Sequence, residues 1–437
     1  MSPSSPLPAD RSRTRSWLVV GMLVLLTLIN FGDKSVLGLA AVPLSKEFGL
    51  SHAEYGFIGS SFYFLYSLAA LLVGFLALRV RAYWILLVMA LLWSVFQLPV
   101  AVITSVPLLL VCRIGLGAAE GPGTPLVVHT AHDEFPPGRR GVPTALALVG
   151  AGLGTAIAAP TLTALIVHLG WRSAFVALAV AGLVWAVAWA FIGRRPGPYS
   201  APVLSRQQDR GSIRDRELWR TILSPTWIGS LLISLAAYWA LALTLIWLPS
   251  YLEKELGHSA TVTSGLLVIP ALIGVLTQLC VLFVSDRLAR RGRRPRTARA
   301  LPLAVVGVVA GLCLVSIPLA TGTAATVLLL VGLGLPPGCI ALGQLLFGQI
   351  SPVRQRPAVL GAADSLVPLP GLISPAVMGW QVDAADSARA GFGHGWMLTG
   401  ALLLAGAVAA VFLVRRDTPR TETVEPEDVV VAGRQEV

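Results

Sequence analysis

The most unusual residues of the chain are charged side chains that interrupt long apolar runs. Arg113 and Glu120 lie in the stretch CRIGLGAAEGP, inside a run that is otherwise apolar from Val106 to Val128. If this run is a helix, the spacing of seven residues places both side chains on one face, two turns and about 10 Å apart. A guanidinium group attracts an anion and a carboxyl group can exchange a proton, so the pair has the chemistry of an anion site.

A second charged pair, Asp33 and Lys34, lies near the middle of another apolar run, in the motif NFGDKS. Adjacent helical residues project about 100° apart, so one side chain can face a cleft and the other a neighbouring helix. Each charge at a bilayer centre costs about 2.5–3.5 kcal/mol, so all four side chains must face the protein interior. We expect them to meet in a hydrated cavity, where the cations attract an anionic substrate and the acids exchange protons.

A purely structural role for these charges is the alternative. Internal ion pairs could fix the packing of the helices without any part in binding. Well-packed apolar residues would often hold the helices as well or better, which favours the functional interpretation.

The composition places these charges inside a membrane protein. The 437 residues are 55% hydrophobic and 13% charged, with a mean hydropathy of +0.76, whereas about a quarter of the residues of a soluble domain are charged. Continuous apolar runs of about 20 residues recur along the chain, which predicts helices and not alternating barrel strands. We predict an all-α membrane protein with twelve transmembrane helices at residues 17–44, 55–78, 83–103, 106–131, 142–168, 173–193, 226–251, 262–284, 300–320, 324–350, 356–381 and 395–414.

Positive charge is concentrated on one side of the predicted membrane. With the N-terminus inside, the predicted external loops contain only four basic residues, Lys46, Arg172, Lys254 and Arg389. This is the positive-inside pattern for an even number of spans, and it places both termini in the cytoplasm. The net charge of +11 therefore reflects topology in a lipid bilayer and does not indicate a nucleic-acid partner. Arginine greatly outnumbers lysine, which is typical of a GC-rich bacterial genome and suggests a bacterial inner membrane.

The chain divides into two similar halves. We expect an N-terminal cytoplasmic tail at 1–16, six-helix bundles at 17–193 and 224–416, a hydrophilic cytoplasmic linker at 194–223, and a disordered tail at 417–437. The motif PLSKEFGLSHAEYG after the first helix is similar to PSYLEKELGHSATVTSG after the seventh, at an offset of 208 residues. Two parallel six-helix repeats imply a central cleft between pseudo-symmetric bundles.

A second echo falls at the ends of the second and eighth helices, in GFLALRVRA and FVSDRLARRGRR. The later copy resembles the loop motif of the major facilitator superfamily, in which an acid and arginines latch neighbouring helices at the inner face. On this resemblance we assign Asp286, Arg287 and Arg79 to gating. Leu78 occupies the place of the acid in the earlier copy.

Several motifs together resemble the anion:cation symporter family of that superfamily. They are NFGDKS, FYFLY, CRIGLGAAEGPGTP and FPPGRRG, followed by GWRSAF and IWLPSYLEKELGHS. The resemblance implies the major facilitator fold and proton-coupled import, by alternating access, of an organic anion such as a sugar acid or an aromatic carboxylate. It also implies that Asp33 and Glu120 couple protons, that Arg113 faces the substrate, and that Tyr66 lines the site.

Three positions depart from the family pattern. Phe31 stands where tyrosine is common, and Asp364, in GAADSLVPLPG, stands where asparagine is usual. Lys34 replaces an arginine, and its ammonium group lacks the planar fork that grips a carboxylate. In the second half, Gln344 and Ser365 are further polar candidates for contact with the substrate.

Two other functions stay open. A proton-driven antiporter that exports drugs or metabolites would use Asp33, Asp364 and the aromatic residues, and a receptor or scaffold would use the fold without transport. The cysteines lie in predicted helices without metal or redox spacing, and no hydrolytic triad is present. We therefore expect no enzyme activity, no metal and no cofactor other than the proton as coupling ion, in a protein that acts as a monomer.

Overall fold

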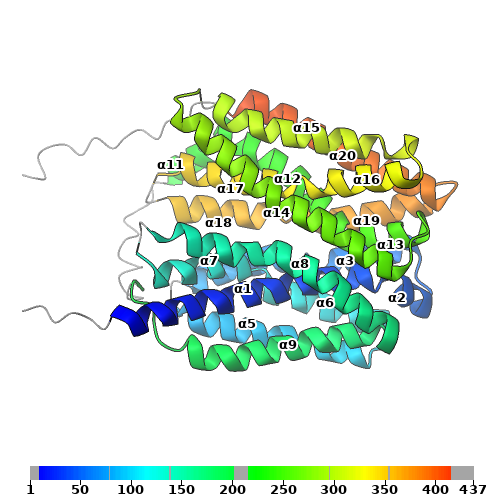
Figure 1. Ribbon diagram of the computed structural model, residues 1–437, viewed down its shortest axis with the longest axis horizontal. Coiled ribbons are helices and arrows are strands. Elements are labelled where there is room, and N and C mark those ends of the chain that lie inside the picture. Colours follow the sequence, from blue (N-terminus) through cyan, green and yellow to red (C-terminus); the bar gives the residue numbers. More distant parts are fainter. Residues whose placement is uncertain are drawn as a thin grey trace, which may run out of the picture.

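The computed structural model describes residues 9–77, 79–136, 139–200, 215–294, 296–352 and 355–414. These residues form helices and contain no strand, which confirms the predicted all-α class. Most of the helices run along one axis, and the two ends of the described chain lie at the same end of the bundle (Figure 1). We call this the terminal end. The opposite end carries α2 and α13.

The first half of the chain, up to residue 200, forms nine α-helices and one short 3₁₀ helix among its described residues. In order they are α1 (Ala9–Leu39), α2 (Ala41–Phe48), α3 (His52–Ser61), α4 (Tyr66–Leu76), α5 (Ala82–Gln97), η1 (Leu98–Ala101), α6 (Val106–Glu120), α7 (Gly123–Glu134), α8 (Gly141–Leu169) and α9 (Trp171–Ile192).

The second half begins with the short helix α11 and continues through the same kind of bundle. Its elements are α11 (Asp215–Ile222), α12 (Pro225–Ile246), α13 (Leu248–Lys254), α14 (Ala260–Arg290), the π-helical turn η3 (Arg296–Ala300), α15 (Leu301–Val315), η4 (Ile317–Leu319), α16 (Gly322–Gly334), α17 (Pro337–Ile350), α18 (Arg356–Leu366), α19 (Pro370–Asp383) and α20 (Ala388–Leu413).

The described helices make twelve passes through the bundle. Eleven passes are long and apolar enough to cross a membrane. The twelfth consists of α6 and α7, which follow one another along the bundle axis in Figure 1. It is divided at Gly121 and Pro122 and carries Arg113 and Glu120. The twelve predicted passes are therefore present, and the pass outside the eleven apolar spans is the one that contains Arg113 and Glu120.

Two broken passes from opposite halves pack against each other. One is interrupted between α3 and α4, and the other between α18 and α19, where Pro368 cannot continue the hydrogen-bond ladder. Helix α3 packs on α19, and α4 packs on α18. The ring of Tyr63, in the first break, lies against Gly371, where a side chain would collide with it. The two interruptions therefore meet at the boundary between the halves.

The sequence echo after the first and seventh passes corresponds to one backbone pattern. Helix α2 ends at Gly49, and α13 is followed by Gly257; both glycines have positive φ, of 65° and 72°, a conformation that favours glycine. Ser51 then caps α3 and Ser259 caps α14, each accepting a backbone N–H three residues on. Each half turns its chain in the same way at the opposite end.

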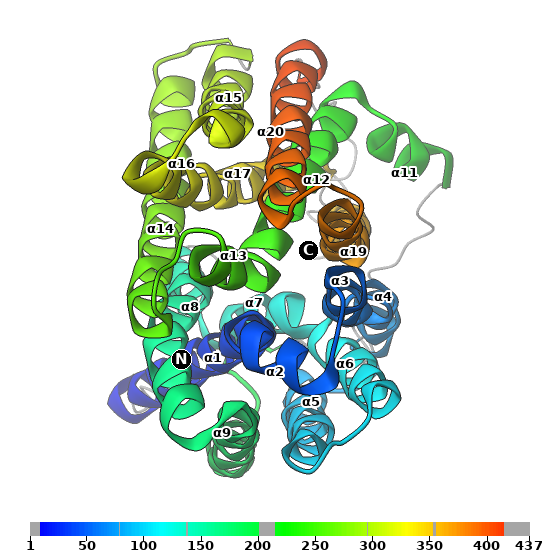
Figure 2. The ribbon, with the colours of Figure 1, turned by 90° about the vertical axis from the view of Figure 1, so that its right-hand side faces the viewer.

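The two halves are closed together toward the opposite end, where Figure 2 shows α3 beside α19. Asp383 of α19 accepts hydrogen bonds from the backbone N–H of His52 (3.2 Å) and Ala53 (2.7 Å), and its carboxylate lies 2.8 Å from Nδ1 of His52. The Tyr55 hydroxyl donates to the carbonyl of Ile246 at 3.2 Å. The backbone N–H of Ala376 donates to Ser60 Oγ at 3.1 Å, and the side chains of Tyr63 and Tyr238 are hydrogen-bonded across the same boundary. Most hydrogen bonds between described residues of the two halves thus involve α3, so this helix forms much of the closure.

We predict that Asp383→Ala opens this closure. The substitution removes three hydrogen bonds between the halves, and a loss of about 1 kcal/mol would raise the open population roughly fivefold. Ser250 lies beside His52 in a small cavity of about 70 Å³, so Ser250→Cys reports on opening through its rate of maleimide labelling in a background that lacks the native cysteines. Asp386→Ala, which removes an exposed acid from the same loop, is the matched control. Equal labelling of both variants would show that Asp383 does not hold the halves together.

Candidate functional site

The four charged residues singled out in the sequence come together in the first half. Helix α1 contributes Asp33 and Lys34, and α6 contributes Arg113 and Glu120. Each cation lies within electrostatic reach of both carboxyl groups. All four side chains are directed into the protein and none faces lipid, as their cost in a bilayer requires.

The site is not the open, hydrated cavity that we expected. The four residues are between 0% and 4% exposed. Aromatic side chains of the break between α3 and α4 and of the first residue of α4 cover the cations. The Phe62 ring centre lies 4.9 Å from Cζ of Arg113, and the Tyr66 hydroxyl lies 3.3 Å from Nζ of Lys34. The expectation of a hydrated cavity was wrong for this conformation, because the rings of Phe62 and Tyr66 lie against the cations and the cluster is buried.

Asn30 connects a cation to a carboxylate in this site. Lys34 Nζ donates to Asn30 Oδ1 at 2.8 Å, and Asn30 Nδ2 donates to Glu120 Oε2 at 2.6 Å. An amide can do this because it carries an acceptor and two donors on one group. Our sequence analysis gave Asn30 no role, although it precedes Lys34 by four residues and so shares its helix face.

Gln97, at the end of α5, is a second residue that the sequence analysis missed. Its Nε2 donates to Oδ1 of Asp33 at 2.5 Å, and Gln97 is 1% exposed. The neighbours on α1 therefore point to different partners, Asp33 to α5 and Lys34 to Asn30 and Tyr66. This divergence follows from the 100° rotation between adjacent helical residues.

The Arg113 guanidinium has unused hydrogen-bonding capacity. Its Nε and Nη1 are buried and have no hydrogen-bond partner within the described part of the chain, and the same is true of Glu120 Oε1 and Asp33 Oδ2. No ion pair within 4 Å joins Arg113 to Glu120 in that part of the chain, and Glu120 accepts a hydrogen bond from Asn30 instead. Buried donors without partners are unfavourable, so Arg113 retains hydrogen-bonding capacity that no described residue uses.

Phe31 and Tyr66 flank the ammonium group of Lys34. Nζ lies 4.6 Å from the centre of the Phe31 ring and 5.1 Å from that of Tyr66, distances at which an aromatic face attracts a cation. The Tyr66 hydroxyl also lies within electrostatic reach of Asp364, on α18 of the second half. Tyr66 therefore stands between the charged cluster and the other bundle.

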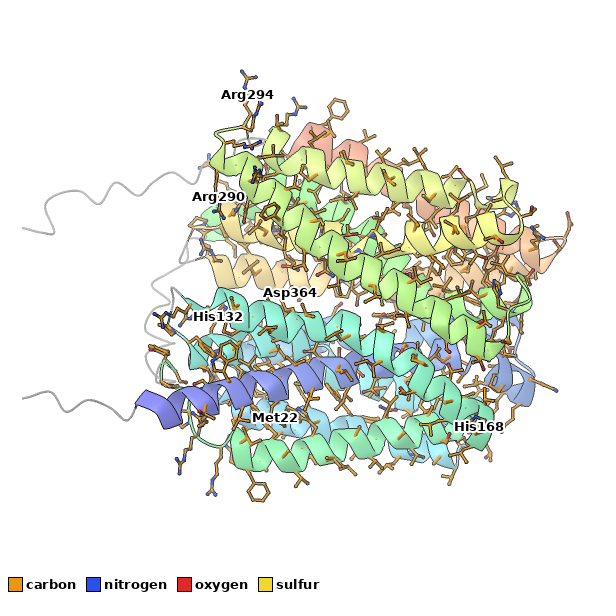
Figure 3. The ribbon with its side chains drawn as sticks, viewed as in Figure 1. Met22, His132, His168, Arg290, Arg294 and Asp364 are labelled. Atoms are coloured by element: carbon orange, nitrogen blue, oxygen red, sulfur yellow. The ribbon has the colours of Figure 1, made fainter. Side chains whose placement is uncertain are left out.

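The second half contributes one polar pair near this boundary. Gln344 Nε2 of α17 donates to Asp364 Oδ1 of α18 at 2.8 Å, and Figure 3 labels Asp364 where α18 borders the first half. Ser365 instead donates to the carbonyl of Gly361 in its own helix at 2.9 Å. The structure thus brings Asp364 and Gln344 together and leaves the Ser365 hydroxyl engaged elsewhere.

The residues assigned to gating lie away from this cluster. Asp286 forms an ion pair of 2.9 Å with Arg299, which also donates to Ser285 Oγ at 2.7 Å and so ties α14 to η3. Arg299 was not among the residues that we assigned from the motif. Arg287 and Arg79 are exposed, and Leu78 lies outside the described residues.

Comparison with known proteins identifies the family. The family model described as Major Facilitator Superfamily matches residues 23–341. The chain belongs to the Major Facilitator Superfamily. It is therefore a multi-pass membrane protein of a transporter family, and its named relatives are transporters and not enzymes.

Three relatives of this superfamily member align along nearly their whole length. A probable sulfoacetate transporter from Cupriavidus necator is 26% identical, over 92% of this chain and 95% of its own. A probable L-galactonate transporter from Escherichia coli is 28% identical, over 94% of this chain and 93% of its own. A hexuronate transporter from Bacillus subtilis is 29% identical, over 94% of this chain and 98% of its own. The names agree with the resemblance to the anion:cation symporter family.

Solved structures support the major facilitator fold. A bacterial homologue of the human lysosomal transporter Spinster, in an inward-facing and unoccupied conformation, has a TM-score of 0.74 at 17% identity, with 96% of this chain and 100% of that chain covered. A D-xylose–proton symporter has a TM-score of 0.72 at 16% identity, with 93% of this chain and 98% of that chain covered. At these identities the likeness concerns the fold alone.

We predict that Asn30→Leu destabilises the protein. The substitution keeps a similar volume but leaves Lys34 and Glu120 without their shared partner, at a cost of about 1–3 kcal/mol. The melting temperature of the purified protein should fall clearly. Ser35→Ala is the control, because Ser35 is also buried on α1 but donates only to Gly32 of its own helix. Equal melting temperatures for the two variants would contradict the bridging role of Asn30.

Proposed function

We propose that this protein is a proton-coupled symporter that imports a small organic anion, such as a sugar acid or an aromatic carboxylate, by alternating access. The observation that carries the proposal is the buried Arg113 guanidinium, whose Nε and Nη1 have no hydrogen-bond partner among the described residues. The transporters named for sulfoacetate, galactonate and hexuronate support it, because all three substrates are organic acids.

The carboxylate of the substrate binds between Arg113 and Lys34. The guanidinium offers N–H donors at Nε and Nη1 without hydrogen-bond partners among the described residues, and charge-assisted hydrogen bonds from such donors position a carboxylate as well as attract it. The ammonium group of Lys34 adds a point charge without that directionality. Phe31 and Tyr66, which flank Lys34, supply an apolar wall for the rest of the substrate.

Charge balance couples the anion to a proton. The two cations and two carboxylates of the cluster sum to zero when all are ionised, so an incoming carboxylate adds one uncompensated negative charge. Such a charge is strongly unfavourable in a buried site. A proton on Glu120 or Asp33 restores neutrality, and each of these acids has one oxygen without a hydrogen-bond partner in the described chain. Proton and anion therefore favour each other's binding, which is the thermodynamic requirement for symport.

Transport requires the site to face each side of the membrane in turn. We assign the terminal end, where Figure 3 labels Arg290 and Arg294, to the cytoplasm by the positive-inside rule. The closure formed by α3 and Asp383 then lies on the outer side of the bacterial inner membrane. When it opens, proton and anion enter; when it closes, the two halves rock and release both inside, in a transporter that works as a monomer.

We predict that Glu120→Gln uncouples transport from protons. The amide keeps the hydrogen bond from Asn30 but cannot be protonated, so the variant should exchange substrate across a membrane without concentrating it. Proteoliposomes with an inward proton gradient measure accumulation, and the same vesicles without a gradient measure exchange. Glu54→Gln, which alters an exposed acid of the same half, should behave like the parent protein. Full accumulation by Glu120→Gln would show that this residue does not couple protons.

Asp364 provides a test of substrate charge. Asp364→Asn keeps an oxygen to accept the hydrogen bond from Gln344 but removes a negative charge from the site, so it should lower KM for an organic anion by roughly three- to tenfold. An exporter of cations would respond in the opposite direction, with weaker binding of its substrate. Uptake kinetics of the variant against the parent, at one fixed pH, separate the two functions.

A further inference from the structure

A groove on the outer face of α1 is not used by the mechanism above. It lies toward the terminal end, has a volume of about 740 Å³, and is apolar apart from Thr14. Its lining includes Trp17, Gly21 and Leu25 of α1, together with Ile192 at the end of α9. Figure 1 shows α1 between α8 and α9. The lining residues Trp17, Leu18 and Leu25 are 38–54% exposed, so the groove lies on the outer surface.

A glycine between large side chains produces the groove. Trp17, Gly21 and Leu25 are spaced by four residues and so lie on one face of α1. A Cβ atom added at Gly21 would meet no atom within 4 Å. The Trp17 ring is held edge-on against Phe135, with 5.2 Å between the ring centres. The groove is therefore a fixed feature of the membrane-facing surface.

A basic turn follows the groove directly in the chain. Arg194 and Arg195, next to Ile192 and Gly193, are exposed, and within the described residues their side chains form no hydrogen bond or ion pair. Their backbone carbonyls are bound to the protein instead: Arg81 donates to that of Arg194 at 3.0 Å, and Arg15 donates to that of Arg195. The turn is thus anchored through its backbone and leaves two guanidinium groups for an external anion.

We propose that the groove and this turn form a binding site for an anionic phospholipid of the cytoplasmic leaflet. One acyl chain lies along α1 over Gly21, and the phosphate lies on Arg194 and Arg195. The apolar groove matches the chain, and the two arginines match a headgroup with net negative charge, which a zwitterionic headgroup lacks. The site depends on the cytoplasmic placement of the terminal end but not on the identity of the transported anion.

Native mass spectrometry of the full-length protein in detergent tests the headgroup contact. Titration with dioleoyl-phosphatidylglycerol and with dioleoyl-phosphatidylcholine should show one site with at least tenfold tighter binding of phosphatidylglycerol. Each arginine near an anionic lipid contributes roughly fivefold, so R194Q/R195Q should weaken phosphatidylglycerol binding by at least tenfold. R290Q/R291Q, which removes two exposed arginines at the same end of the molecule, should leave this site unchanged. Equal affinity for both lipids, or equal effects of both double variants, would overturn the proposal.

The acyl-chain contact has its own test. Gly21→Leu adds a side chain to the groove, at a position where a new Cβ meets no atom within 4 Å, and should weaken phosphatidylglycerol binding several-fold. Gly74→Leu is the control, because it adds the same side chain at another glycine with no atom within 4 Å of the new Cβ. Melting temperatures measured without added lipid verify that both variants are folded. If Gly21→Leu abolished a dimer and left lipid binding intact, the occupant of the groove would be a second copy of the chain, and the lipid proposal would be wrong.

Discussion

The burial of two cations and two carboxylates in one place is the constraint on which the rest of the structure depends. None of these side chains could face lipid at an acceptable cost, and none could be buried alone. They are therefore gathered between α1 and α6, where Asn30 and Gln97 each satisfy part of the carboxylates. The arrangement leaves Nε and Nη1 of Arg113 without hydrogen-bond partners among the described residues, which is the basis of the proposal that the cluster accepts an anion.

The helices that surround this cluster are interrupted where the two bundles meet. The breaks between α3 and α4 and between α18 and α19 lie against each other, and they bring Tyr66 between the first-half charges and Asp364. Residues of α3 on the other side of the break make the closure with α12 and α19. One short region of the chain thus contributes both to the surroundings of the charged cluster and to the contact between the two halves.

Much of this organisation follows from the sequence, because the physics involved is local. The cost of charge in an apolar run identifies the four charged residues of α1 and α6 without any knowledge of the fold. The repeated turn with Gly49 and Gly257 follows from the sequence similarity between the halves. Other features depend on distances across the bundle. The links from Asn30 to Glu120 and from Gln97 to Asp33 join different helices, and no spacing along the chain reveals them. The covering of the cations by Phe62 and Tyr66 depends on the conformation that the bundles adopt.

The amide of Asn30 provides a way for protonation of Glu120 to change the hydrogen bonding of Lys34. An amide offers its oxygen on one side and its nitrogen on the other, and here the oxygen faces Lys34 while the nitrogen faces Glu120. If the bonded oxygen of Glu120 became a hydroxyl, it would turn from acceptor to donor, and the amide could match it only by rotating its oxygen toward Glu120. That rotation withdraws the acceptor from Lys34 and frees the ammonium group. Rotation of the Asn30 amide would thus link protonation of Glu120 to release of the Lys34 ammonium group, one turn further along α1.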